Sequence, residues 1–86
     1  MGEHLVGTVT HYFGKPQVAI VEITSGELHV GDDIRISGHS SDFTQRVASM
    51  ELEHEHVESA TVGQSVGIKV SERAREHDSV YRVTAD

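Results

Sequence analysis

The stretch QVAIVEITSGELHVGDDIRI, residues 17–36, decides the fold. Its first part, 17–23, is an almost uninterrupted apolar run rich in β-branched residues, which predicts a strand buried on both faces. After a turn at Gly31, the segment 33–37 alternates apolar and polar residues, which predicts a strand with one face in the core. We therefore predict two β-strands in this stretch, with a glycine turn between them.

The rest of the chain has the same β character. No segment shows a convincing apolar period of about 3.6 residues, and turn signals recur at spacings of about 8–12 residues. Six strands packed this closely predict an all-β fold, either a small antiparallel barrel or a sandwich. The predicted strands are 4–13, 17–23, 33–37, 43–53, 65–70 and 79–84.

Three turns share a pattern in which a turn pair precedes a β-branched strand opener. Gly31 and Gly63 occupy the place where the backbone needs a positive φ, which glycine adopts without a steric penalty. His77 takes the corresponding place in the third turn, and histidine tolerates the left-handed region better than most residues. We therefore predict positive φ at all three positions.

Length and composition limit the possible functions. A chain of 86 residues is expected to form one domain, 1–86, too small for a catalytic core beside a substrate domain. Seven Lys and Arg against fourteen Asp and Glu give a formal charge of −7, so we expect no tight autonomous binding to nucleic acid. The chain has no cysteine, no apolar run of membrane-spanning length and no secretory signal pattern. We expect a cytoplasmic protein that binds no membrane.

The segment MELEHEHVE, 50–58, suggests chemistry and also has a simpler interpretation. On a continuous strand Glu51 and Glu53 face one way, while His54 and His56 face the other with Met50. The two histidines could supply two ligands to zinc or nickel, with Glu58, His39 or His77 as further ligands. The alternative is a solvated strand end. Catalysis by Glu51 with Glu53 is not expected, because same-face acids on a strand stand roughly 6.5–7 Å apart and no concave site is implied, and we predict no catalytic residue.

Two other groups are candidate contact residues. Tyr12 and Phe13, at the end of the first predicted strand, form either a stacking platform for a partner or packing at the mouth of the barrel. Arg73 and Arg75, with Lys69 and Arg82 nearby, form a basic cluster. This cluster either contacts RNA or an acidic partner surface, or pairs its charges with Glu72, Glu76 and Asp78.

The chain also resembles domain 2 of the translational GTPases of the elongation factor Tu type. The resemblance rests on four pieces in order: a G-x-V strand at 7–9, GELHVGDDI at 26–34, VASMEL at 47–52 and ATVGQSVGI at 60–68. Small stand-alone proteins described as translation elongation factor-like look closest. The resemblance implies a six-stranded Greek-key barrel, the fold of translation-protein domain 2.

The resemblance also implies a ligand site. In elongation factor Tu this domain holds the end of charged tRNA, and Glu51 matches a pocket acid while Ser65 stands where the family has an asparagine. No G-x-x-x-x-G-K-S/T motif occurs in the chain, so we expect no GTP and no cofactor.

The sequence therefore predicts a non-enzymatic β-barrel binding module, with a protein or ribonucleoprotein partner, that docks on the translation machinery. The alternatives are an accessory protein–protein interaction module unrelated to translation, and a weak divalent metal binder that uses His54 and His56.

Overall fold

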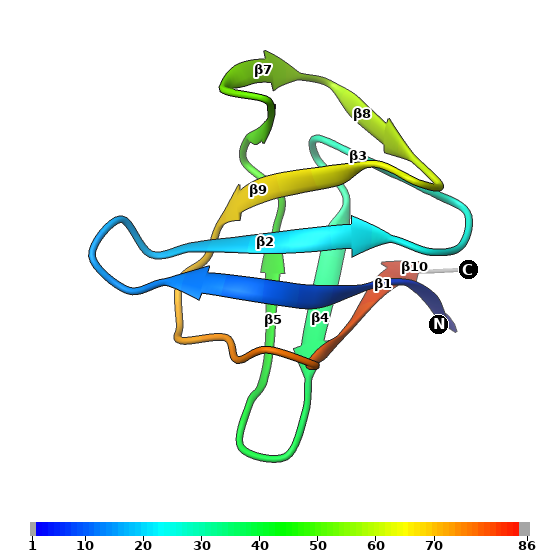
Figure 1. The fold of residues 1–86 in the computed structure, drawn as a ribbon. Coiled ribbons are helices and arrows are strands. Elements are labelled where there is room, and N and C mark those ends of the chain that lie inside the picture. Colours follow the sequence, from blue (N-terminus) through cyan, green and yellow to red (C-terminus); the bar gives the residue numbers. More distant parts are fainter. Residues whose placement is uncertain (1, 85–86) are drawn as a thin grey trace.

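The computed structural model describes residues 2–84, and within them every regular element is a β-strand (Figure 1). The strands are β1 (Gly2–Phe13), β2 (Val18–Ile23), β3 (Glu27–His29), β4 (Asp33–Ser37), β5 (Asp42–Arg46), β6 (Met50–Leu52), β7 (Glu55–Val57), β8 (Ser59–Thr61), β9 (Ser65–Lys69) and β10 (Ser79–Thr84). The predicted all-β class is confirmed. No helix within 2–84 has the length and apolar character that crossing a membrane requires.

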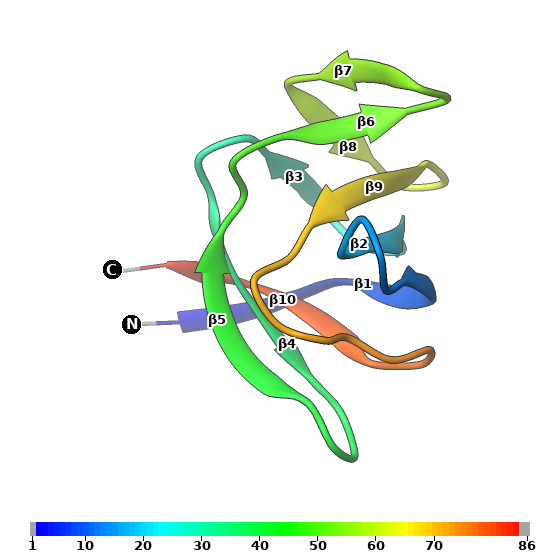
Figure 2. The ribbon, with the colours of Figure 1, turned by 90° about the vertical axis from the view of Figure 1, so that its left-hand side faces the viewer.

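One large antiparallel sheet carries most of the strands, in the order β5-β4-β10-β1-β2-β9-β6-β7, and β3 pairs with β8 apart from it. The two ends of the described chain meet, because Gly2 of β1 lies opposite Thr84 of β10. Viewed from the side, the sheet curls so that β4 and β5 cross the other strands (Figure 2). The result is a barrel-like shell with β5 and β7 as the edge strands of the large sheet.

The predicted strands are present, but the count of six is wrong. The segment 43–53 is divided into β5 and β6, since residues 47–49 leave the sheet between them. Three short strands, β3, β7 and β8, were missed; each has only three residues, too few to show a period. The expectation that 17–23 is buried on both faces is also wrong. In β2, Ala19 and Val21 are fully buried whereas Val18 and Ile20 are only half-buried.

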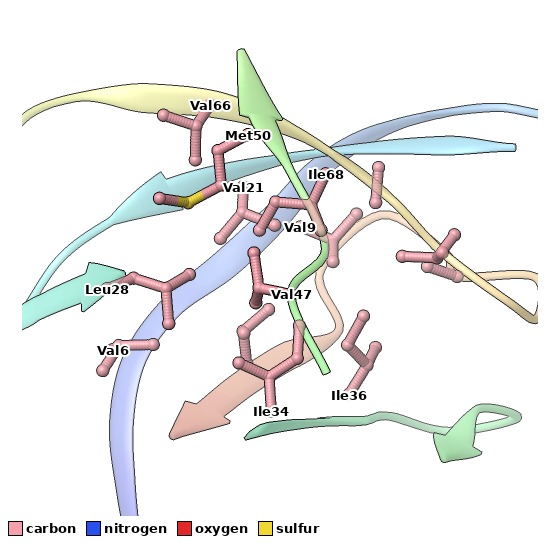
Figure 3. Packing of buried hydrophobic residues seen from close by; sticks show 14 of the residues in the cluster. Val6, Val9, Val21, Leu28, Ile34, Ile36, Val47, Met50, Val66 and Ile68 are labelled. Carbon is pink, nitrogen blue, oxygen red and sulfur yellow. The ribbon is translucent and has the colours of Figure 1, made fainter. Parts of the chain in front are cut away.

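The core lies on the concave side of the curled sheet (Figure 3). Alternate residues of β2, β4 and β9 point into it, as the period of two along a strand requires. Each fully buried Val, Leu or Ile stabilises the fold by about 1.5–3 kcal/mol relative to exposure. The labelled core residues are Val6, Val9, Val21, Leu28, Ile34, Ile36, Val47, Met50, Val66 and Ile68.

Two irregularities in β1 control which side chains face the core. The register shifts between Leu5 and Gly7 against β10, and between Val9 and His11 against β2. Such a bulge adds one residue to one strand and so reverses the faces beyond it. Gly7 sits where the backbone of β2 approaches closely, because a Cβ there would collide with the carbonyl oxygen of Glu22.

Gln45 of β5 connects two parts of the shell that do not pair through their backbones. Its Nε2 donates to the Lys69 carbonyl oxygen at 2.9 Å, and its Oε1 accepts from the Ser71 N–H at 2.7 Å. The Gln45 side-chain amide thus makes the kind of paired hydrogen bonds that backbone groups of neighbouring strands make, and so links β5 to the end of β9.

The predicted turn conformations are confirmed. Gly31, Gly63 and His77 have φ of 98°, 93° and 76°. Three further non-glycine residues, Gln17, Glu53 and His54, also have positive φ. The last two lie inside the segment that was predicted to be one continuous strand.

Candidate functional site

A row of paired residues crosses the outer face of the sheet from β1 to β7. His11 lies opposite Ile20, Ile20 opposite Gly67, Gly67 opposite Glu51, and Glu51 opposite His56. Paired residues in an antiparallel sheet share a face, so these five positions line up on one side. The middle position is a glycine, and the missing side chain leaves a hollow in the row.

That hollow is a surface groove with a volume of about 410 Å³. Its floor and walls are mostly apolar, and polar groups stand at one side. The lining residues are Phe13, Pro16, Val18, Ile20, Glu51, Glu53, His54, Ser65 and Gly67. We call it the Gly67 groove.

The apolar wall comes from the β1–β2 hairpin. A Cβ at Gly67 would lie 3.3 Å from Val18 Cγ1 and 3.6 Å from Ile20 Cδ1, so these two side chains stand directly beside the glycine. Phe13 is 46% exposed, so much of its ring faces solvent. Its ring meets the His11 ring edge-on, at 4.4 Å between centroids and 61° between planes. The phenyl ring is therefore held in place and still open to a ligand.

The polar wall comes from the β6–β7 hairpin. Leu52 pairs with Glu55, so the chain reverses through the two residues Glu53 and His54, with φ of 50° and 68°. Two consecutive positive φ values are those of the type I′ turn that suits a two-residue hairpin. The turn brings Glu53 and His54 over the groove next to Glu51.

Three of the predicted contact residues meet in this groove. Phe13, Glu51 and Ser65 all line it, although they come from β1, β6 and β9. Tyr12 does not join them, because the bulge in β1 turns it toward the core beside Ala19. Of the two alternatives, packing describes Tyr12, which lies against the core, whereas Phe13 is open.

The expected arrangement of the histidines is also wrong. His54 lies in the turn, and His56 of β7 faces Glu51, with 3.7 Å between His56 Nε2 and Glu51 Oε2. The tight turn breaks the strand and so ends the alternation that would have put both histidines on the Met50 side. Within 2–84 no three His, Cys, Asp or Glu residues come close enough together to hold a metal ion. His39, His77 and Glu58 are thus not brought to this hairpin as ligands.

Arg73 and Arg75 lie at a second hollow of about 270 Å³, with Tyr12, Ala74 and Glu76. Lys69 and Arg82 are not part of it, so the predicted basic cluster is smaller than expected. The expected charge pairing is also absent among residues 2–84. Glu76 Oε1 lies 3.5 Å from His11 Nδ1, and Asp78 accepts the backbone N–H of Arg75.

Sequence reasoning missed Pro16, Val18, Ile20 and Gly67 as groove residues. A usable signal was present in SVGIKV, where a glycine interrupts a strand at an outward position. Glycine inside a strand often marks close approach of a ligand or another backbone. Val18 and Ile20 of the apolar wall carried no such signal, because an apolar strand residue is normally assigned to the core.

Comparison with solved structures gives the same fold. The C-terminal domain of a protein described as a U32 peptidase from Geobacillus thermoleovorans superimposes with a TM-score of 0.87 at 20% identity, over 94% of this chain and 93% of that chain. Its selenomethionine variant gives a TM-score of 0.84 at 21% identity, over 90% and 96% of the two chains. At this identity the likeness establishes the fold alone.

Sequence relatives are longer proteins. A Porphyromonas gingivalis protein named collagenase is 44% identical over 78 residues, which is 90% of this chain and 22% of that protein. An uncharacterized protease of Methanocaldococcus jannaschii is 36% identical over 77 residues, 88% of this chain and 19% of that protein. The chain spans about a fifth of the length of these curated relatives.

The family comparison covers three of the four sequence pieces on which the resemblance rests, those at 26–34, 47–52 and 60–68. The model of elongation factor Tu domain 2 matches residues 17–77, which include β2 to β9 and therefore most of the Gly67 groove. This chain belongs to the elongation factor Tu domain 2 family.

Proposed function

We propose that this chain is a non-catalytic binding module whose ligand lies in the Gly67 groove. The observation that carries the proposal is an apolar-floored groove on the outer face of a sheet whose inner face carries the core. Concave sites lined by apolar groups with a few polar groups at one side are typical of ligand sites.

The chemistry of the two walls indicates the kind of ligand. Phe13, Val18 and Ile20 present apolar surface, and Glu51 and Glu53 present carboxylates at the other side. An extended polypeptide segment with an apolar side chain next to a basic one matches both walls. The apolar group covers the glycine floor, and the cation reaches the carboxylates.

We further propose that the module works beside a catalytic part of a larger peptidase-type protein. The support comes from two relatives, one named a collagenase and one a protease, which share this region over only about a fifth of their lengths. The module would then position a polypeptide substrate, while cleavage takes place elsewhere.

Phe13 and Leu5 offer a matched test, since both lie on β1 and are 46% and 48% exposed, but only Phe13 lines the groove. The probe is the capped peptide Ac-Lys-Leu-Lys-NH₂, titrated into labelled protein by NMR. We expect shifts centred on Val18, Ser65 and Gly67, with binding at least about fivefold weaker in Phe13→Ala, a loss of about 1 kcal/mol. Leu5→Ala should bind like the wild type. Shifts spread evenly over the surface, or equal binding by both variants, would refute the groove assignment.

A chimera tests the peptidase context. This chain replaces the matched 78-residue region of the Porphyromonas gingivalis relative, with and without Phe13→Ala. We expect both chimeras to cleave a short peptide equally and the Phe13→Ala chimera to cleave a protein substrate more slowly. Equal rates on the protein substrate would count against a substrate-positioning role.

Docking on the translation machinery is the second candidate, favoured by the family to which residues 17–77 belong. Glu51 and Ser65, at the positions of the family pocket, do line the groove. Sedimentation of the chain with ribosomes at low and moderate salt tests this candidate. Absence from the ribosomal fractions under both conditions would remove it, and retention that Phe13→Ala abolishes would favour it over the peptidase context.

A further inference from the structure

The loop between β9 and β10 holds two arginines that the groove does not use. Val70 donates its N–H to the Gln17 carbonyl oxygen at 2.9 Å, and His77 donates to the Val9 carbonyl oxygen at 2.8 Å. Between these anchors Ala74 is buried, with 1% of its surface exposed. Arg73 and Arg75 flank this buried residue and are exposed, so a loop fixed at both ends presents them to solvent.

A further set of bonds fixes the loop just after the arginines. Asp78 is 3% exposed, and its Oδ2 accepts the Arg75 backbone N–H at 2.9 Å while its own N–H donates to the Arg75 carbonyl oxygen at 3.1 Å. The carbonyl oxygen of Asp78 in turn accepts from the Val9 N–H at 2.8 Å. The backbone position of Arg75 is therefore set by the backbone of β1, so that ligand binding has to order the arginine side chain but not the loop.

Two of the three acids closest in sequence are engaged elsewhere, and the third, Glu72, is exposed. Asp78 is used by the backbone of the loop, and Glu76 faces His11. Among residues 2–84 neither Arg73 nor Arg75 forms an ion pair, whereas Arg35 pairs with Glu3 and Asp42, and Arg46 pairs with Asp33. Two unpaired guanidinium groups side by side are unexpected in a chain of net charge −7.

The two arginines stand at the second hollow, of about 270 Å³, whose wall includes Tyr12. A guanidinium group binds a carboxylate in a bidentate manner through two parallel N–H donors, and a phenol adds an O–H donor. We propose that this hollow, the Arg73–Arg75 site, binds the side-chain carboxylates of an acidic polypeptide segment. This site is separate from the groove of the proposed function and does not depend on it.

The observations favour polypeptide over nucleic acid as the source of the anion. A phosphate backbone carries a charge at every nucleotide and is bound by a series of cations along its path. Here two guanidinium groups stand together, with Glu76 in the same hollow and Glu51 and Glu53 in the groove. A run of two or three carboxylates needs only the two arginines, and the acidic remainder of the surface repels a longer polyanion.

The site also lies next to the groove through β1. Tyr12 and Phe13 are neighbours in the chain, and successive side chains on a strand point to opposite faces. Tyr12 lines the Arg73–Arg75 site and Phe13 lines the Gly67 groove. One partner could therefore contact both hollows on either side of the end of β1.

The test uses a fluorescein-labelled Gly-Glu-Glu-Glu-Gly peptide, with Gly-Gln-Gln-Gln-Gly as the uncharged counterpart, and fluorescence anisotropy at low ionic strength. Arg73→Gln and Arg75→Gln are compared with Arg46→Gln, which removes the same charge from a paired arginine elsewhere on the surface. We expect binding of the acidic peptide alone, weakened about tenfold by each of the first two changes and less than about twofold by Arg46→Gln. Phe13→Ala should leave this binding unchanged.

Amide shifts in the wild-type protein give a second readout that requires no variant to fold. We expect the acidic peptide to shift residues 12 and 73–76 first. Equal weakening by Arg46→Gln would mean a general charge effect and would overturn the proposal, as would shifts located elsewhere or no binding at all. Tighter binding of an oligouridylate than of the acidic peptide would assign the site to RNA and would also overturn it.

Discussion

Glu51 of β6 faces His56 of β7 across a two-residue turn, with 3.7 Å between Glu51 Oε2 and His56 Nε2. This pair forms one end of the residue row that contains Gly67, so the same turn that brings the two side chains together also closes the polar side of the groove. Both side chains are more than half exposed, at 51% and 77%. The pair is therefore a surface contact, and its importance lies in the shape of the hairpin.

The turn itself can be improved, because Glu53 and His54 adopt positive φ without being glycine. Left-handed backbone costs an L-residue about 1–2 kcal/mol relative to glycine, and Asn-Gly is the preferred pair in such hairpins. We expect the double change Glu53→Asn with His54→Gly to raise the free energy of unfolding by about 1 kcal/mol in urea denaturation. The same pair placed at Glu55 and His56, inside β7, should lower it. A loss of stability at the turn would contradict the type I′ assignment.

The hairpin geometry also bears on the metal alternative. Because His54 lies in the turn and His56 faces Glu51, the two histidines cannot act as two ligands on one face of a strand. We expect calorimetry with zinc to give the same heat for the wild type, His54→Ala and His56→Ala. A tight binding event abolished by either substitution would restore the metal hypothesis.

Gly7 is predicted to be essential for folding. A Cβ at Gly7 would collide with the Glu22 carbonyl oxygen, a backbone atom of β2 that cannot move aside without distorting the central sheet. We expect Gly7→Ala to destabilise the protein by more than about 2 kcal/mol, measured by chemical denaturation. Gly14→Ala is the control, because its nearest neighbour would be a ring carbon of Tyr12 at 3.8 Å, an ordinary contact. Similar stability of the two variants would refute the close approach.

Acid dependence should appear at the Arg35–Asp42 pair. The Nε of Arg35 donates to Asp42 Oδ1 at 2.9 Å, and this hydrogen bond lowers the pKa of Asp42 below its ordinary value of 3.8. A carboxyl whose pKa is lowered by folding adds stability above its unfolded pKa and loses it as the pH falls through the folded value. The difference in Tm between the wild type and Asp42→Asn should thus be present at neutral pH and vanish well below pH 3.8.

The double-mutant cycle supplies the control for that pair. In an Arg35→Gln background, Asp42→Asn should change Tm equally at neutral and acid pH, because the donor that lowers the pKa is gone. A pH-dependent difference that persists without Arg35 would assign the effect to another group.

Gln45 is expected to matter for closure of the shell. Its amide satisfies the Lys69 carbonyl and the Ser71 N–H, and its removal leaves both without that partner. We expect Gln45→Ala to lower the free energy of unfolding by about 1–2 kcal/mol. Thr44→Ala, on the adjacent exposed position of the same strand, should cost less than about 0.5 kcal/mol. Equal effects would mean that Gln45 acts only through strand propensity.

Much of the fold could be read from the chain, and the reasons are local. The alternation in Asp33–Ser37 follows from the strand period, and the positive φ of Gly31, Gly63 and His77 follows from turn chemistry. Strands of only three residues were missed because no period fits in them. The apolar run 17–23 was misread because two of its five apolar residues, Val18 and Ile20, line the groove and not the core.

The candidate site was predictable in part. Glu51, Ser65 and Phe13 were named in advance and do line one groove, but Val18, Ile20 and Gly67 were not named. They meet through the pairing of β2 with β9 and of β9 with β6. Nothing local in the chain specifies which strands become neighbours.

The sequence by itself determined an all-β chain with its main strands, its left-handed turns and the family to which residues 17–77 belong. Only the tertiary structure decided which side chains share a face. The physical reason is that side chains alternate between the two faces of a strand. One extra residue at the Val9–His11 bulge, or the tight turn at Glu53 and His54, exchanges the faces of all the residues that follow in that strand. The bulge decides that Tyr12 and not Phe13 faces the core, and the tight turn places His56 opposite Glu51.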